Sequence, residues 1–196
     1  MERPEAVAGQ AELEVIVRST RWLMDALEAA RRVGAPDWMI GAGAVRTAVW
    51  DRLHGYQAPT PLADIDLIFF DAGDLSERRE RAVQARLSAE LARVAWDVKN
   101  QAAVHLWYPK RFGFAVEPLG SPADAVATWP ETATCVALRL RADDQLEMCA
   151  PLGLDDLLGL VHRRNPRRVS VEEYEDRLAA KRIAERWPKV TIVHPR

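Results

Sequence analysis

Apolar residues recur first with helical and then with strand spacing along the first third of the chain. Over residues 12–32 they recur every three or four positions, which predicts an amphipathic helix. A short apolar run over residues 38–40 predicts a buried strand over residues 37–40, and a second helical pattern follows over residues 44–54. Residues 65–70 are apolar on both faces and predict a central strand.

The same mixture continues to the end of the chain. The further predicted elements are helices over residues 75–92, 154–161 and 171–187, a short helix opening at residues 121–124, an alternating strand over 94–99, and a hairpin of strands 134–140 and 145–149. This order predicts an α/β or α+β arrangement of layers. We expect an α/β core over residues 1–150 and a C-terminal helical extension over 151–196 that packs on the core.

Composition narrows the class of protein. The chain has 196 residues, of which 48% are hydrophobic, so a sizeable core is expected. Its net charge of −2 gives no general attraction to nucleic acid or to an anionic membrane. No transmembrane run or signal-peptide pattern is seen, so we expect a cytoplasmic protein with no membrane partner. Cys135 and Cys149 lack metal-binding spacing and are expected to be core residues.

A glycine-containing turn lies between the first predicted strand and its helix. It reads Gly41-Ala42-Gly43, and backbone N–H groups in such a turn can hold phosphate oxygens. Arg46 follows in the first helical turn and could bind a phosphate with two hydrogen bonds, and Thr47 could bind one more weakly. The alternative is that the glycines only allow close packing of strand and helix.

A pair of acidic residues stands at the start of the second apolar run. Asp64 and Asp66 are two positions apart on a strand, so their carboxylates share one face and could share a divalent cation. Two unpaired carboxylates on an otherwise apolar strand are costly. The alternatives are a solvated entrance to the strand or a salt bridge from Arg46 to one of the two aspartates.

These two motifs carry a resemblance. A small-residue turn before a helix, followed by Asp64-Ile65-Asp66, resembles the polymerase-β-like nucleotidyltransferase superfamily. Four further segments are similar to the bacterial nucleotidyltransferase-like family called the type-six group. They are AVWDRLHG at 48–55, WDVKNQ at 96–101, APLGLDDL at 150–157 and WP at 187–188. Together they cover nearly the whole chain. The resemblance implies an α+β fold, with a mixed β-sheet, flanking helices and further helices at the C-terminal end.

The resemblance implies a role for each matching residue. The turn from Gly41 to Gly43 would hold the β- and γ-phosphates of a nucleoside triphosphate, although Ala42 stands where Gly or Ser is usual. Asp64 and Asp66 would bind Mg²⁺ or Mn²⁺. Asp97 would be the third carboxylate, binding a second metal and activating the acceptor hydroxyl. The alternative for Asp97 is a strand-edge ion pair with Lys99.

The function expected from this resemblance is a Mg²⁺-dependent nucleotidyltransferase. It would move a nucleoside monophosphate from a nucleoside triphosphate to an unidentified acceptor hydroxyl on a small molecule, an RNA end or a protein. The alternative is a catalytically inactive module of the same fold that binds a nucleotide or a partner. A dinucleotide-dependent oxidoreductase with Asp71 at the ribose is a third option.

Two further segments carry weaker signals. Trp107-Tyr108 is an aromatic pair in what we expect to be a loop, where the bolder interpretation is a platform for a nucleobase. Residues 163–168 form a strongly basic patch. We expect this patch to be a solvated loop between two helices, and contact with a polyanion such as RNA is the alternative.

Overall fold

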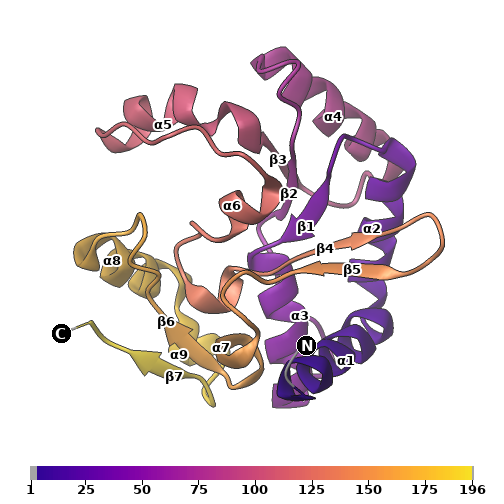
Figure 1. The fold of residues 1–196 in the computed structure, drawn as a ribbon. Coiled ribbons are helices and arrows are strands. Elements are labelled where there is room, and N and C mark those ends of the chain that lie inside the picture. The colour runs from indigo at the N-terminus through magenta and orange to yellow at the C-terminus, as the bar shows by residue number, and fades with distance from the viewer. Residues whose placement is uncertain (1–3, 196) are drawn as a thin grey trace.

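A five-stranded mixed sheet organises the fold, a computed structural model that describes residues 4–195 (Figure 1). Its strands, in the spatial order β3-β2-β1-β4-β5, are β1 (Met39–Gly41), β2 (Ile65–Phe69), β3 (Trp96–Asn100), β4 (Ala137–Leu140) and β5 (Leu146–Cys149). The pair β2–β3 is parallel and the other pairs are antiparallel. The predicted strand over residues 65–70 is therefore an interior strand, paired on both sides.

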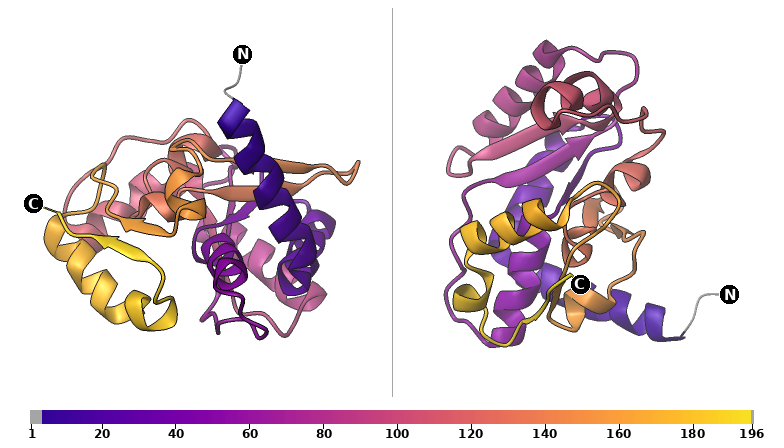
Figure 2. Two further views of the ribbon diagram at one scale, coloured as in Figure 1. Left: turned by 90° about the horizontal axis from the view of Figure 1, so that it is seen from below. Right: turned by 90° about the vertical axis from the view of Figure 1, so that its left-hand side faces the viewer.

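Helices cover the sheet and extend beyond it. They are α1 (Pro4–Ser19), α2 (Arg21–Val33), α3 (Gly43–His54), α4 (Glu77–Glu90), α5 (Val104–Phe112), α6 (Pro122–Val126), α7 (Asp155–Leu158), α8 (Val171–Lys181) and α9 (Ile183–Arg186), with 3-10 turns η1 (Gln101–Ala103) and η2 (Thr132–Thr134). A parallel pair, β6 (Val161–Arg163) and β7 (Thr191–Val193), forms a second small sheet. Figure 1 shows α5 and α8 on the side away from α1, α2 and α4, and the right view of Figure 2 looks onto that side.

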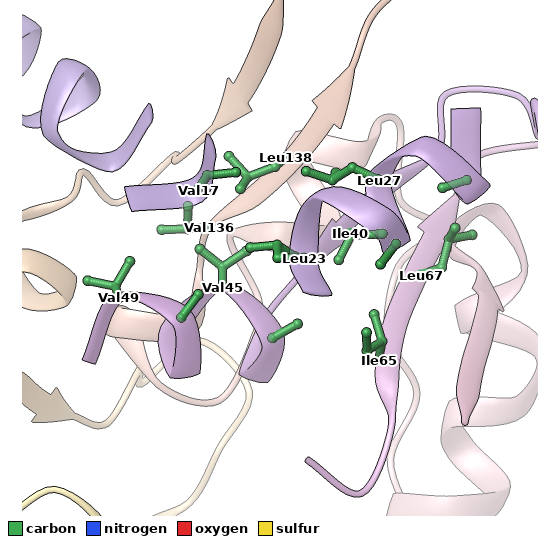
Figure 3. Packing of buried hydrophobic residues seen from close by; sticks show 14 of the residues in the cluster. Val17, Leu23, Leu27, Ile40, Val45, Val49, Ile65, Leu67, Val136 and Leu138 are labelled. Carbon is green, nitrogen blue, oxygen red and sulfur yellow. The ribbon is translucent and has the colours of Figure 1, made fainter. Parts of the chain in front are cut away.

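The main core lies between one face of the sheet and the first helices. Ile40, Ile65 and Leu67 point from β1 and β2 toward Leu23 and Leu27 of α2 (Figure 3). Burial of each such side chain contributes about 1.5–3 kcal/mol to folding. Since strand residues alternate between faces, the even-numbered positions of β2 are turned to the opposite face of the sheet.

Much of the predicted pattern is confirmed. The α+β class, the helix after the glycine turn and the 134–149 hairpin are all present. Gly55 ends α3 in the left-handed conformation, with φ +74°. The Ser121 hydroxyl accepts a hydrogen bond from the Asp124 N–H and caps α6, as its position before Pro122 predicts.

The single helix predicted over residues 12–32 is wrong, because the chain breaks at Thr20 into α1 and α2. Both the Ser19 and the Thr20 hydroxyls donate hydrogen bonds to the Ile16 carbonyl, at 2.9 and 2.8 Å. Thr20 then takes an extended conformation, with φ −94° and ψ 92°. Side-chain hydrogen bonds of this kind compete with helical ones and bend or end helices.

The second half of the chain differs more from prediction. Trp107 and Tyr108 lie in α5 rather than in a loop. The predicted helix over 154–161 is limited to α7 and gives way to β6, so the basic patch begins in a strand and not in a loop between helices. The predicted helix over 171–187 divides into α8 and α9 at Arg182, whose φ is +50°. The proposed boundary near residue 150 stays a prediction.

Three observations bear on compartment and redox state. No helix within residues 4–195 combines the length and the apolar character needed to cross a membrane. Cys135 is buried, Cys149 is half-buried, and neither takes part in a disulfide. The N-terminal segment without a signal-peptide pattern falls partly outside the described residues, at positions 1–3.

Candidate active site

A cleft of about 650 Å³ opens between α3, β2, α5 and α8. The residues around it form three walls of different chemistry. The first is acidic and comes from the start of β2, the second is cationic and comes from α3 and α8, and the third is aromatic and comes from α5. The N-terminal end of α3 lies among them.

The acidic wall is made by Asp64 and Asp66. Both line the cleft, whereas Ile65 between them points into the core, so the predicted shared face of the two aspartates is confirmed. Burial, together with repulsion from Asp64 and Asp97, raises the pKa of Asp66 to about 6. Ionisation of the Asp66 carboxylate at neutral pH therefore has a free-energy cost, and a cation in the cleft would reduce that cost.

Asp97 lies beside this pair on the neighbouring strand. In the parallel pairing of β2 and β3, Asp66 and Asp97 are direct partners. The Asp97 carboxylate also forms a half-exposed ion pair with the Lys99 ammonium at 3.1 Å, which is the alternative that its position allowed. Asp97 does not belong to the cleft lining, but its charge contributes to the raised pKa of Asp66.

The two glycines of the turn have different surroundings. A Cβ on Gly41 would lie 2.6 Å from the Trp129 ring and 2.7 Å from the Val136 carbonyl oxygen, so this glycine is needed for close packing. A Cβ on Gly43 would meet no atom within 4 Å, and Gly43 lines the cleft. Ala42 between them takes φ +51° and ψ −121°, a conformation that favours glycine.

The turn leaves the start of α3 available to a ligand. Ala42 makes no side-chain cap, and the first helical hydrogen bond runs from the Arg46 N–H to the Ala42 carbonyl at 3.1 Å. The Ala42 N–H donates to the Val136 carbonyl at 3.2 Å, so the amides that lack helical acceptors are those of Gly43, Ala44 and Val45. Because Gly43 opens onto the cleft, the positive end of the helix dipole faces the space beside the acidic wall.

Arg46 does not form the salt bridge to Asp64 or Asp66 that was one of its two interpretations. Its guanidinium is held over the rings of Trp50 and Trp187, 5.3 and 5.2 Å from their centroids. The side chain still lines the cleft, although the residue is only 3% exposed. Thr47, by contrast, is fully buried and is absent from the cleft lining.

The carboxylate nearest to Arg46 is Glu131, which sequence reasoning missed. Its Oε2 lies 3.8 Å from Arg46 Nη1, and its Oε1 accepts hydrogen bonds from Arg177 Nε at 3.0 Å and Lys181 Nζ at 3.4 Å. Burial alone would raise the pKa of Glu131, but the surrounding cations Lys181, Arg177 and Arg46 lower it to about 2. No local motif marks Glu131, because its partners come from distant helices.

The loop that carries Asp64 is anchored through one buried aspartate. Asp51 accepts hydrogen bonds from the Thr60 N–H at 2.7 Å, the Thr60 hydroxyl at 2.5 Å and the Trp187 indole N–H at 2.7 Å. Arg186 Nη2 donates to the Pro61 carbonyl at 2.6 Å. Two of the quoted sequence segments, 48–55 and 187–188, thus meet in space to fix the loop before β2.

A second buried polar residue, Asn100, organises the far end of the parallel pair. Its side-chain carbonyl accepts hydrogen bonds from the N–H groups of Asp71 and Ala102, and so caps the 3-10 turn η1. Its amide donates to the Asp71 and Asp74 carbonyls. The carboxylate of Asp71 is engaged by Arg79 Nε at 2.9 Å, so Asp71 serves the loop after β2.

The aromatic wall consists of Trp107, Tyr108 and Phe112 of α5, all of which line the cleft. Tyr108 and Phe112 have ring centroids 4.4 Å apart. The Arg168 guanidinium lies 5.2 Å from the Tyr108 centroid and brings part of the basic patch to the same opening. A planar group entering the cleft would meet ring faces here.

Comparison with known proteins gives a consistent result. Residues 28–192 match the model of a family described as nucleotidyltransferase. A solved NMR structure described as revealing a CCA-adding enzyme head domain is similar to this chain, with a TM-score of 0.75 and 28% sequence identity. The match covers 92% of this chain and 95% of that one. No curated protein matches the sequence.

Proposed function

Because this chain belongs to that nucleotidyltransferase family and has the polymerase-β-like fold, we propose that it transfers a nucleoside monophosphate from a nucleoside triphosphate to an acceptor hydroxyl. The observation that carries the proposal is the unpaired Asp64–Asp66 wall beside the free N-terminal end of α3. One surface suits a cation and the other suits phosphate, and both face one cleft.

The donor set at the acidic wall fits Mg²⁺ or Mn²⁺. Within residues 4–195, no three His, Cys, Asp or Glu side chains are arranged to hold a metal by themselves. Mg²⁺ is usually held by one or two carboxylates together with substrate phosphates, so Asp64 and Asp66 are a sufficient protein contribution. Bound there, the cation would stabilise charge on the reacting phosphates.

Residues of the chain would position the reactants. The free amides at the start of α3 would orient the phosphates of the donor, and Gly43 would let them approach the backbone. The acceptor oxygen bonds to the α-phosphorus, the bond from that phosphorus to the bridging oxygen breaks, and pyrophosphate leaves. We propose Asp97, beside Asp66, as the carboxylate that helps to remove the proton of the acceptor hydroxyl.

An inactive binding module of the same fold is the second candidate. Two observations favour it: Asp97 is paired with Lys99, and Ala42 occupies a strained position in the turn. The two candidates make different predictions for turnover but the same prediction for fold. The dinucleotide option receives no such support, because Asp71 is engaged with Arg79.

Nucleotide binding by the full chain tests the proposal. Thermal-shift and calorimetric titrations would use ATP, CTP, GTP and UTP, with and without Mg²⁺. CTP and ATP come first because the similar structure is described as a CCA-adding enzyme head domain. The comparison protein is Asp64→Asn/Asp66→Asn, and a matched control is Glu12→Gln/Glu117→Gln, which neutralises two exposed carboxylates elsewhere.

We expect metal-dependent stabilisation by at least one nucleotide in the wild type and the control, and its loss in the aspartate variant. In an assay with an accepted substrate, removal of both carboxylates should reduce turnover by roughly 10³-fold or more. Metal-dependent binding without pyrophosphate release, over a panel of hydroxyl acceptors, would favour the inactive module. Absence of binding by every nucleotide would contradict both nucleotide-binding candidates.

A further inference from the structure

The cationic wall carries more positive charge than its carboxylate balances. Arg46, Arg177 and Lys181 surround Glu131, and we call these four residues the Glu131 cluster. Three cations against one carboxylate leave a formal charge of +2 on the wall of the cleft. Arg186 adds a further positive charge to the lining. An excess of this size in a partly buried place is unfavourable without a counter-ion.

The buried guanidinium group of Arg46 has N–H groups that lack acceptors in the part of the chain that the structure describes. The residue is 3% exposed, and its Nε and Nη1 find no hydrogen-bond partner among residues 4–195. Its distance of 3.8 Å to Glu131 is too long for a hydrogen bond. Buried guanidinium N–H groups without acceptors are costly, and this side chain lines the cleft. An anion that entered beside Arg46 would supply the acceptors.

The geometry of the donors indicates the class of anion. Two guanidinium groups and one ammonium group converge, and guanidinium groups match the oxygens of phosphate with paired hydrogen bonds. Arg177 and Lys181 are about one-third exposed, so they can reach a ligand in the cleft while they hold Glu131. Their charges also act on Asp66, which places the cluster within electrostatic range of the acidic wall.

We propose that Arg46, Arg177 and Lys181 form a phosphate-binding subsite of the cleft, distinct from the N-terminal end of α3. The proposal rests on the proposed function for its role and takes either the departing pyrophosphate or a phosphate group of the acceptor. Glu131 acts as the internal counter-ion that holds the three cations together before the ligand arrives. The two sources share one chemistry and are separated by the experiment below.

Calorimetric titration of the full chain with inorganic pyrophosphate tests the subsite directly. The titration is done in EDTA, so that it does not depend on metal at Asp64 and Asp66. The test variant is Arg177→Gln/Lys181→Gln. The control, Arg78→Gln/Arg86→Gln, removes the same charge from exposed positions of α4. Because charge-assisted hydrogen bonds are involved, we expect the test variant to bind pyrophosphate roughly tenfold or more weakly.

The control variant distinguishes a specific phosphate subsite from a general effect of the positive charge of the protein. Equal weakening in the test variant and the control would overturn the proposal, and so would absence of pyrophosphate binding by the wild type. If the double variant fails to fold, as judged by circular dichroism, Lys181→Gln alone takes its place under the same criteria. Strong loss in the test variant with an unchanged control supports the subsite.

Competition identifies the source of the phosphate. If pyrophosphate and a nucleoside triphosphate exclude each other, the subsite takes the donor or its leaving group. If ribose 5-phosphate binds together with the nucleotide, and this binding is lost in the test variant, the subsite takes the acceptor. The proposed function can fail independently: in that case Mg²⁺-dependent nucleotide binding is absent while pyrophosphate binding still requires Arg177 and Lys181.

Discussion

Two carboxylates on different walls of the cleft have pKa values that are shifted in opposite directions. Asp66 and Glu131 are both largely removed from water, which by itself raises the pKa of each. Around Asp66 the neighbours are Asp64 and Asp97, and the pKa rises to about 6. Around Glu131 the neighbours are Lys181, Arg177 and Arg46, and the pKa falls to about 2.

The difference indicates what each wall lacks. At the acidic wall the repulsion from Asp64 and Asp97 outweighs the attraction of Lys181 and Arg177 for Asp66, so a metal ion suits this wall. The cationic wall holds its carboxylate with three positive charges, so an anion suits it. A net charge of −2 for the whole chain conceals both imbalances, because they cancel at the level of composition. A ligand that carries phosphate and metal together would satisfy both walls at once.

Removing the charge of Glu131 should have the largest effect on stability. In Glu131→Gln the three cations lose their shared counter-ion, and breaking a buried ion pair of this kind costs about 3–5 kcal/mol. The free energy of unfolding, measured with urea, should fall by that amount. Glu185→Gln, an exposed ion-pair residue, serves as the control and should leave the unfolding curve nearly unchanged.

In the same variant the affinity for pyrophosphate should rise while the stability falls. With the internal carboxylate neutral, the cluster has a formal charge of +3, and pyrophosphate should bind more tightly at a temperature where the variant is folded. The lowered pKa of Glu131 means that its contribution to stability is fully present above about pH 5 and is lost as the pH falls toward 2. An unchanged urea midpoint in Glu131→Gln would show that the cations do not depend on this carboxylate.

Asp66→Asn should change stability in the other direction. The folded protein holds the Asp66 proton up to about pH 6, above the ordinary pKa of 3.8, so the wild type loses stability as the pH rises between those values. The Asn variant lacks this loss. Without metal, its free energy of unfolding should exceed that of the wild type by about 3 kcal/mol at pH 7.

The pH series separates this effect from a general change in packing. Urea unfolding at pH 7 and at pH 4 should show the gain at the first pH and little of it at the second, because Asp66 is then protonated in the wild type. A gain of equal size at both values would assign it to packing. A loss at pH 7 would show that Asp66 is structural and paired, and would contradict the acidic wall as a metal site.

The glycine turn between the two walls offers a matched pair of variants. Gly41→Ala would press a methyl group against Trp129 and the Val136 carbonyl, at 2.6 and 2.7 Å, and overpacking of this kind costs about 1–3 kcal/mol. Gly43→Ala meets no atom and should leave stability unchanged. Because Gly43 lines the cleft, its variant should instead weaken nucleotide binding.

Thermal unfolding and calorimetry on both variants check these opposite effects. If Gly41→Ala is as stable as the wild type, the packing role of Gly41 is wrong. If Gly43→Ala binds nucleotide normally, the start of α3 does not hold the phosphates, and the Glu131 cluster becomes the main anion site of the cleft.

Local pattern predicted the parts of this molecule that depend on near neighbours. The alternation around Asp64 and Asp66, the turn before α3 and the 134–149 hairpin were accessible because strand period and turn chemistry are local properties. The break at Thr20 was missed because two hydroxyls donate to one carbonyl in place of a helical N–H, which periodicity does not show. Helix α5 was not predicted, and it carries Pro109 in its interior, a residue that is unfavourable there.

The cationic wall was beyond local reasoning for a different reason. Glu131 and its partners Arg177 and Lys181 are 46 and 50 residues apart in the chain, and only the docking of α8 brings them together. Arg46 was singled out from the sequence, yet its partner was sought among the aspartates near in sequence, whereas its nearest carboxylate is Glu131. Sequence reasoning therefore singled out residues of all three walls but did not reveal Glu131 or its partners on α8.

Asp97→Asn has the smallest expected effect and decides whether the acidic wall contains two carboxylates or three. Asp97 is paired with Asp66 across the two parallel strands, and its carboxylate also forms an ion pair with Lys99. Its removal should therefore reduce turnover by roughly tenfold, the lower end of the range for groups that support metal ligands. It should also lower the pKa of Asp66, because one repelling charge is gone, and the acidic limb of the pH–rate profile should move to lower pH. Lys99→Met breaks the same ion pair but keeps the carboxylate, and the opposite movement of its acidic limb is expected. Equal, small effects of both variants on turnover, with no movement of the limb, would assign Asp97 to a strand-edge ion pair and leave Asp64 and Asp66 as the whole acidic wall.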